Sequence, residues 1–216
     1  MKILLIPDIH GREFWLEPCL EWEGQIIFLG DYHDPYPDQV SVEDSLTNLW
    51  KLTEFYKDNS DRCIMLLGNH DFSYVGTEIT CRYDRKNHKE VTKLLEDLSL
   101  KVIHIQDNII FSHAGVTQDW LGHNHINLYD LIKLPIDNSI LSQIPYIRGG
   151  YAEYGSPIWE DLRLFNASHL PDNYYQIFGH TQLKENAYIT DKFADLDCRK
   201  AFIVDTITKE IKEYEN

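Results

Sequence analysis

Histidine, aspartate and asparagine side chains recur just after short apolar segments of this chain. They are Asp8, His10, Asp31, Asp34, Asn69, His70, His113 and His180. Imidazole nitrogens together with carboxylate and amide oxygens suit zinc, iron or manganese, and the lack of thiolate among them argues against a structural zinc site. Their types and order indicate a metal centre that does chemistry.

Short apolar segments must position these side chains. Runs of strand length lie at 2–6, 25–29, 63–67, 101–105, 108–112 and 174–178. Five of the six end shortly before a candidate ligand. Because ligands in α/β sheets bind outside the carboxyl ends of strands, where loops converge, we expect these five strand ends to meet at one place.

The remaining elements complete an α/β pattern. Helical periodicity at 40–58 and 88–98 falls between strand-like runs, and Ser41 with Asp44 is typical of a capping box at the start of the first helix. Strand, helix and strand in this order predict an α/β domain with a mixed or two-sheet core.

Two further regions have weaker patterns. Segment 187–214 alternates β-prone pieces with turn residues, which predicts hairpins and antiparallel strands, and 122–157 indicates helices and loops over one end of the sheets. A chain of 216 residues, 43% of them apolar, is long enough for one substantial core, so we expect residues 1–216 to form a single domain.

Composition excludes several classes of partner. The net charge of −15 argues against general binding to nucleic-acid backbone or anionic membrane, which needs clustered Lys and Arg. No run approaches the roughly 20 apolar residues of a membrane span. The four cysteines contain no C-x-x-C pair, which favours a reduced, cytoplasmic location.

The motif set resembles the calcineurin-like metallophosphoesterases. Their pattern is D-x-H, G-D-x-x-D, G-N-H-[DE], a later His and G-H-x, and the resemblance runs from Asp8 to Thr181. It implies two packed mixed β-sheets flanked by helices, with a dinuclear metal site at one edge. Two ions roughly 3.5 to 4 Å apart can clamp a phosphoryl group and generate a hydroxide nucleophile.

The resemblance also implies a role for each motif residue. Asp8 and His10 hold the first metal ion, Asp31 bridges, and Asn69, His113 and His180 hold the second; Asn69 also contacts the substrate. His70 is the general acid toward the leaving oxygen, and Asp34 orients it. We expect two divalent or trivalent ions, manganese first, with iron, zinc and nickel as alternatives.

A second Gly-His pair competes for the last ligand position. The segment "GHNH" (122–125) fits the G-H-x-H ending of many phosphodiesterases, but no strand-like run precedes it. The "GHT" segment at 179–181 follows a convincing strand, and Gln182 stands where a second His would be. We favour His180 over His123 as the ligand.

Several features favour the branch that contains phage and bacterial serine/threonine phosphatases and diadenosine-tetraphosphate hydrolases. They are "GHT", the Gly of "DIHG" and "PIWED" (157–161), which looks like the W-S-D-P element of that branch. Trp159 is equally compatible with a core aromatic side chain.

The chain departs from this branch at one position. The branch reads G-D-x-x-D-R-G, with the Arg binding the substrate phosphate, whereas Pro35 follows Asp34 here. We hypothesise that Arg12 or Arg163 supplies the missing charge. The basic stretch 81–89 is more simply interpreted as a solvated surface than as a substrate contact.

The expected function is hydrolysis of a phosphomonoester, with a phosphorylated protein or small molecule as the partner. Dinucleoside polyphosphates or cyclic nucleotides are the alternative substrates, although the missing G-H-x-H histidine weighs slightly against diesters. A catalytically inactive scaffold of the same fold is the alternative from another class. Inactive relatives would be expected to lose ligand or acid histidines, yet His10, His70, His113 and His180 are all present.

Overall fold

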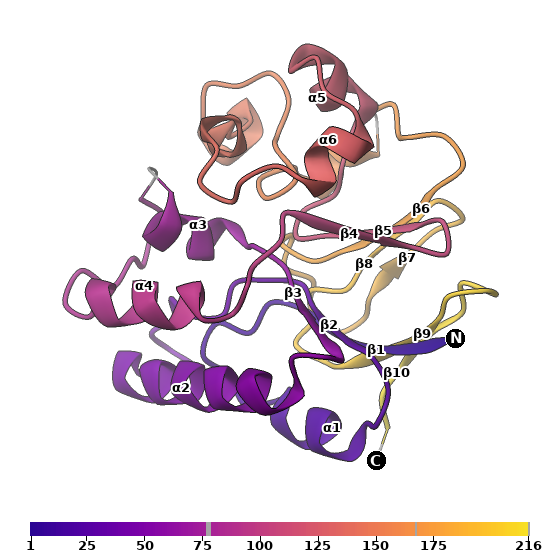
Figure 1. Cartoon of the computed structure of the whole chain (residues 1–216). Coiled ribbons are helices and arrows are strands. Elements are labelled where there is room, and N and C mark those ends of the chain that lie inside the picture. Colours follow the sequence, from indigo (N-terminus) through magenta and orange to yellow (C-terminus); the bar gives the residue numbers. More distant parts are fainter. Residues whose placement is uncertain (77–78, 167, 216) are drawn as a thin grey trace.

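Two five-stranded β-sheets form the centre of the molecule (Figure 1). The computed structural model describes residues 1–76, 79–166 and 168–215. The first sheet has the strand order β10-β9-β1-β2-β3. Its strands are β1 (Lys2–Ile6), β2 (Ile26–Phe28), β3 (Cys63–Met65), β9 (Phe202–Asp205) and β10 (Ile211–Glu213). β1, β2 and β3 run parallel, and β9 is antiparallel to both β1 and β10.

The second sheet has the strand order β4-β5-β6-β8-β7. Its strands are β4 (Ile103–Gln106), β5 (Ile109–Ser112), β6 (Tyr175–Phe178), β7 (Tyr188–Ile189) and β8 (Phe193–Asp195). β5, β6 and β8 run parallel, with β4 and β7 antiparallel at the two edges. Both sheets are therefore mixed, as the resemblance implied.

The two sheets share an apolar interior. Ile3 and Leu5 of β1 pack in one buried cluster with Phe111 of β5 and Ile177 of β6. Leu4, the residue between them, belongs to a second cluster that faces the helices, because successive side chains of a strand point to opposite faces. Burial on both faces explains why β1 reads as an unbroken apolar run.

Helices cover the outer face of the first sheet (Figure 1). They are α1 (Leu16–Glu21), α2 (Val42–Asn59) and α4 (His88–Glu96). The Ser41 side chain accepts the Asp44 amide at 3.0 Å, so the predicted start of α2 is confirmed. Leu49 and Leu52 of α2 and Leu94 of α4 are buried in the cluster on this face.

Short helices and loops lie over the second sheet (Figure 1). They are α5 (Gln118–His123), α6 (Leu128–Ile132), 3-10 turns at Ser139–Ser142 and Tyr146–Arg148, and α7 (Leu162–Phe165). This agrees with the expectation for 122–157. Among the described residues, no helix is long and apolar enough to cross a membrane.

Two elements differ from the sequence-based expectation. A further helix, α3 (Asn69–Val75), begins inside "GNHD", where only a strand end was expected. In 187–214, the pairs β7–β8 and β9–β10 are antiparallel as predicted, but β8 also pairs in parallel with β6. The parallel pairing places β7 at the edge of the sheet and β8 beside β6, an order that the alternation of β-prone and turn residues does not specify.

Candidate active site

The loops after five parallel strands meet at one edge of the molecule. The amide of His10, after β1, donates to the carbonyl of Asp31, after β2, at 2.7 Å. The amide of Gly179, after β6, donates to the carbonyl of His113, after β5, at 2.8 Å. The backbone of α3, after β3, joins them, since the His70 amide donates to Asp31 Oδ1 at 2.9 Å. The predicted convergence of strand ends is therefore present.

At this edge, two groups of side chains have their potential ligand atoms close enough together to bind a metal ion. The potential ligand atoms of His10, Asp31 and His70 lie within 4.8 Å of one another, and so do those of Asp31, His113 and His180. Asp31 is common to both groups: its Oδ2 lies 3.4 Å from His10 Nε2 and 3.5 Å from His113 Nε2. A carboxylate between two sets of imidazoles is the arrangement that a bridging ligand needs.

Hydrogen bonds to the backbone fix the tautomers of the histidines. His113 Nδ1 donates to the Leu29 carbonyl at 2.8 Å, which leaves the Nε2 lone pair facing Asn69 Oδ1 at 3.0 Å. His10 Nδ1 donates to backbone carbonyls at 3.1 Å, so its Nε2 lone pair faces Asp31. Acceptor atoms that face one another repel unless a cation lies between them, so this donor set fits a metal ion.

Burial alters the protonation of the same groups. It lowers the pKa of His10 and of His180 well below the ordinary value, with repulsion from His70 and from Arg148 respectively as the next causes. It also raises the pKa of Asp31 well above the ordinary value. Neutral imidazole is the form that binds metal, and a buried carboxylate needs a cation to stay charged. Both effects favour cation binding here.

Asp8 lies beside these groups but belongs to neither. Its two carboxylate oxygens accept the His180 amide at 3.0 and 3.2 Å. A Cβ on Gly179 would overlap Asp8 Oδ1, so a side chain there would displace this carboxylate oxygen. Asp8 thus joins the loops after β1 and β6, and its role as a metal ligand stays a prediction.

His70 is oriented by a carboxylate, as the sequence indicated. Its Nδ1 lies 2.8 Å from Asp34 Oδ2, and the Tyr74 hydroxyl donates to the other oxygen of Asp34. Asp34 is fully buried. Tyr74 was not anticipated, since a tyrosine within "FSYV" carries no signal of its partner.

Asp71 is a second residue that sequence reasoning missed. Its carboxylate accepts the amides of Asp31 (2.7 Å), Tyr32 (3.0 Å) and Gly68 (2.9 Å). Burial raises its pKa to about 6, although these hydrogen bonds oppose the shift. Asp71 therefore fastens the loop after β2 to the start of α3. An acidic residue three positions after Gly68, the N-cap, is a capping signal that could have identified it.

Several candidate residues have unusual backbone conformations. His10 (φ 45°), Asp31 (57°), Asp34 (57°) and His180 (71°) all lie in the left-handed region. Non-glycine residues adopt this region rarely, and such residues concentrate at functional sites. These backbone conformations are energetically unfavourable, and the surrounding structure stabilises them at the positions of the candidate site.

The sequence as a whole identifies the family. A profile of the calcineurin-like phosphoesterases matches residues 1–187. The chain belongs to the calcineurin-like phosphoesterase family. It is therefore a metal-dependent phosphoesterase, which is a hydrolase.

Solved structures share the fold. The cold-active protein-tyrosine phosphatase of a psychrophilic Shewanella species has a TM-score of 0.64 at 16% identity, and the match covers 99% of this chain and 80% of that one. A Saccharomyces cerevisiae protein serine/threonine phosphatase similar to human PP5 has a TM-score of 0.57 at 14% identity, covering 100% and 80%. No curated protein sequence matches. The calcineurin-like fold of two mixed sheets flanked by helices is thus confirmed.

Within this family site, the contacts favour His180 over His123. His180 Nδ1 lies 3.0 Å from His113 Nε2, and His180 Nε2 is buried without a hydrogen-bond partner among the described residues. His123 ends α5 and is exposed. Trp159 of "PIWED" packs edge to face against His180, with ring centroids 5.8 Å apart. Trp159 thus borders the site.

The two arginines proposed as substrate contacts are bound to other groups. Arg12 donates to the backbone carbonyls of Ile9 (2.9 Å) and Asp8 (2.8 Å) and so holds the loop after β1. The side chain of Arg163 is 65% exposed and makes a two-pronged contact with Asp161 at 2.8 and 3.0 Å. A phosphate contact by either arginine stays a prediction.

Two other arginines come closer to the histidines. Arg148 pairs with Asp161 at 2.6 Å and donates to the Thr181 hydroxyl at 2.8 Å, next to His180. Arg82 places Nη2 at 3.2 Å from His70 Nε2. Arg82 belongs to the basic stretch 81–89, for which a solvated surface was the favoured interpretation.

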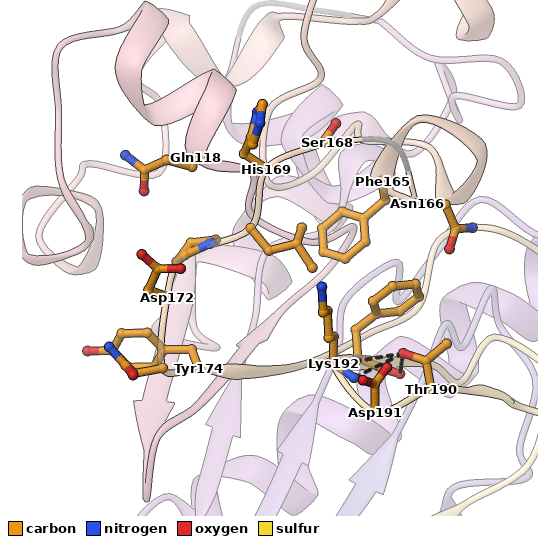
Figure 2. Close-up of a pocket in the computed structure, with 14 residues that line it drawn as sticks. Gln118, Phe165, Asn166, Ser168, His169, Asp172, Tyr174, Thr190, Asp191 and Lys192 are labelled. Carbon is orange, nitrogen blue, oxygen red and sulfur yellow. Dashed lines mark hydrogen bonds between the residues drawn. The ribbon is translucent and has the colours of Figure 1, made fainter.

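A cavity of about 720 Å³ lies away from these groups (Figure 2). It opens between the segment that precedes β6 and the turn between β7 and β8. Residues that line it include Phe165, Leu170, Tyr174, Thr190 and Lys192. None of the eight candidate residues lines it, so this cavity is separate from the candidate centre.

Proposed function

We propose that the chain is a dinuclear metal-dependent phosphatase that hydrolyses phosphomonoesters of a protein or a small molecule. The observation that carries the proposal is the Asp31 carboxylate, whose Oδ2 lies 3.4 Å from His10 Nε2 and 3.5 Å from His113 Nε2. His10 and Asp8 would hold one ion, and Asn69, His113 and His180 the other. When bound, the two ions supply a nucleophile derived from water and neutralise phosphate charge.

The residues of the chain supply the remaining chemistry. His70 donates a proton from Nε2 to the leaving oxygen, because its Nδ1–H is already directed at Asp34. The Asp34 carboxylate stabilises the imidazolium that this role requires, and the Tyr74 hydroxyl holds Asp34 in place. The Asn69 side chain would bind a phosphate oxygen as charge develops.

The proposed substrate class has two supports. Gln182 replaces the second histidine of the G-H-x-H ending, which weighs against diesters. The structural neighbours described above are protein phosphatases, which favours phosphorylated proteins among the monoesters. Dinucleoside polyphosphates and cyclic nucleotides are the alternative substrates.

Manganese is the proposed ion, and the location that we propose is cytoplasmic. None of the four cysteines forms a disulfide, which supports this location.

The test compares esters and variants. Metal-stripped protein resupplied with manganese should hydrolyse p-nitrophenyl phosphate faster than bis-p-nitrophenyl phosphate. Asp31→Asn should abolish most of this activity, and His70→Ala should lower it to a smaller extent, because p-nitrophenolate leaves readily without a proton. Parallel assays with iron, zinc and nickel identify the ion. A preference for the bis-ester would favour the diester alternative, and protein that binds no metal would favour an inactive scaffold.

A further inference from the structure

The branch that the sequence resembles carries a phosphate-binding arginine directly after the second aspartate of G-D-x-x-D, and this chain has no arginine there. Pro35 occupies the position after Asp34, and proline offers neither a charge nor a donor. A phosphate dianion at the metal centre would then lack the planar cation that binds it through two hydrogen bonds. A cation from elsewhere in the chain would have to approach this same turn.

Arg82 lies against this turn. Its Nε donates to the carbonyl of Asp34 at 3.2 Å, and its guanidinium carbon lies 3.9 Å from the ring centroid of Tyr36. Arg82 therefore contacts the residues directly before and after Pro35 in the sequence. The guanidinium thus reaches, from a segment more than 40 residues further along the chain, the turn from which the family's arginine extends.

The same guanidinium faces the catalytic histidine. Arg82 Nη2 lies 3.2 Å from His70 Nε2, the atom that the proposed mechanism directs at the leaving oxygen. An oxygen of a bound phosphate ester would reach both groups and accept from Nη2. The charge of Arg82 also contributes to the low pKa of His10, which places it beside the first group of ligands.

The segment that carries Arg82 is fastened in place. The Thr80 amide donates to Ser73 Oγ at 3.1 Å, and the Asp84 amide donates to the Tyr74 hydroxyl at 2.8 Å. Arg82 itself has φ 67°, in the left-handed region. Anchors on both sides and a costly backbone conformation hold this side chain toward the site.

The other nearby arginines are more fully engaged than Arg82. Arg148 and Arg163 both pair with Asp161, and Arg12 donates to two backbone carbonyls and to Gln39. Arg82 donates to a single backbone carbonyl and contacts His70. Among residues 1–76, 79–166 and 168–215, no carboxylate lies within ion-pair distance of Arg82. Its charge is therefore available to an anionic ligand.

We infer that Arg82 binds the phosphate group of the substrate and replaces the arginine lost at Pro35. The inference rests on the proposed phosphatase function and names the residue that recognises the phosphate. Guanidinium recognises phosphate through two parallel hydrogen bonds, which an ammonium group does not reproduce. Arg82 is thus a substrate-binding residue, contributed by the segment between α3 and α4.

The test measures binding of inorganic phosphate to manganese-loaded protein by calorimetry, without turnover. Arg82→Ala should weaken phosphate binding about 10- to 100-fold, the usual effect of losing charged hydrogen bonds. Arg82→Lys should recover part of this loss. Arg85→Ala removes an exposed arginine of the same segment and should bind phosphate as the unchanged protein does. Manganese content and melting temperature should stay the same in all three variants.

Kinetics with p-nitrophenyl phosphate then separate the possible outcomes. Arg82→Ala should raise KM by a similar factor, with a smaller change in kcat. Unchanged phosphate affinity in Arg82→Ala, or a fall in kcat alone, would overturn the inference, since Arg82 would then only support His70. If the protein hydrolyses no ester, the proposed phosphatase function is refuted. If Arg82→Ala still weakens phosphate binding in that case, the assignment of Arg82 as a phosphate-binding residue stands.

Discussion

His70 illustrates how much chemistry depends on one side chain and its immediate contacts. Asp34 fixes the ring through Nδ1, Tyr74 fixes Asp34, and Arg82 meets Nε2. Because Nδ1 is held by Asp34, Nε2 is the only ring atom from which His70 can transfer a proton to a substrate. The sequence predicted the pair of His70 and Asp34 because both lie in recognisable motifs. It could not predict Tyr74 or Arg82, whose importance arises from tertiary contacts alone.

The role of His70 as an acid predicts a dependence on the leaving group. Phenolate needs a proton more than p-nitrophenolate does, so His70→Ala should lower kcat for phenyl phosphate about 10²- to 10⁴-fold. The loss for p-nitrophenyl phosphate should be much smaller. Steady-state kinetics on both esters measure the difference, and equal losses would show that His70 transfers no proton to the leaving oxygen.

Glu160 predicts a pH dependence of stability. Its carboxylate is buried and accepts the amides of Asp161 and Gly155 at 2.9 and 3.2 Å, and burial raises its pKa to about 7 from the ordinary 4.5. The folded state holds this proton more tightly than the unfolded chain. The contribution of Glu160 is therefore fully present below pH 4.5 and is lost as the pH rises through about 7.

Urea unfolding of metal-free protein between pH 4.5 and 8 measures this effect. The free energy of unfolding should fall by about 3 kcal/mol more in the unchanged protein than in Glu160→Gln, since the glutamine cannot ionise. Glu153→Gln, which changes an exposed carboxylate nearby, should keep the original pH dependence. Parallel curves for the unchanged protein and Glu160→Gln would contradict the assignment.

At the scale of elements, the start of α3 and the loop after β2 form one unit. Gly68 is the N-cap of α3, and Asp71 accepts amides from both segments. The strand ends were predictable because apolar runs and polar tips alternate in the sequence. The helix at Asn69 was not predicted, because Gly-Asn is also ordinary turn chemistry, and the capping position of Asp71 is a weak signal by itself.

This close approach predicts that Gly68 tolerates no side chain. A Cβ at Gly68 would overlap Asp31 Oδ1, so Gly68→Ala should lower the free energy of unfolding by about 1 to 3 kcal/mol and reduce manganese content. Gly122→Ala is the control, because a Cβ there meets no atom within 4 Å. It should stabilise α5 by up to about 1 kcal/mol. Thermal unfolding and metal analysis of both variants provide the measurement.

At the scale of the whole molecule, each sheet contributes part of the candidate centre. His10 and Asp31 follow strands of the first sheet, whereas His113 and His180 follow strands of the second. The order of motifs implied this arrangement only through the family resemblance. Strand order depends on contacts between distant segments, such as the pairing of β1 with β9, for which the local sequence carries no signal.

Metal binding should therefore stabilise the whole fold. A ligand that binds only the folded state at 100 times its dissociation constant adds about 2.7 kcal/mol to the free energy of unfolding. Manganese should raise the melting temperature of the unchanged protein and leave that of Asp31→Asn nearly unaltered. Scanning calorimetry at several manganese concentrations tests this, and an equal rise in both proteins would mean that the ions bind elsewhere.

The position of Asp31 between the two sheets also has a mechanical consequence. Ions held there would link the loops after β1 and β2 of the first sheet to the loops after β5 and β6 of the second sheet. The two sheets could then no longer separate by a partial opening. Protection against amide hydrogen exchange should rise together in β1, β5 and β6 when manganese is added, including at amides far from any ligand.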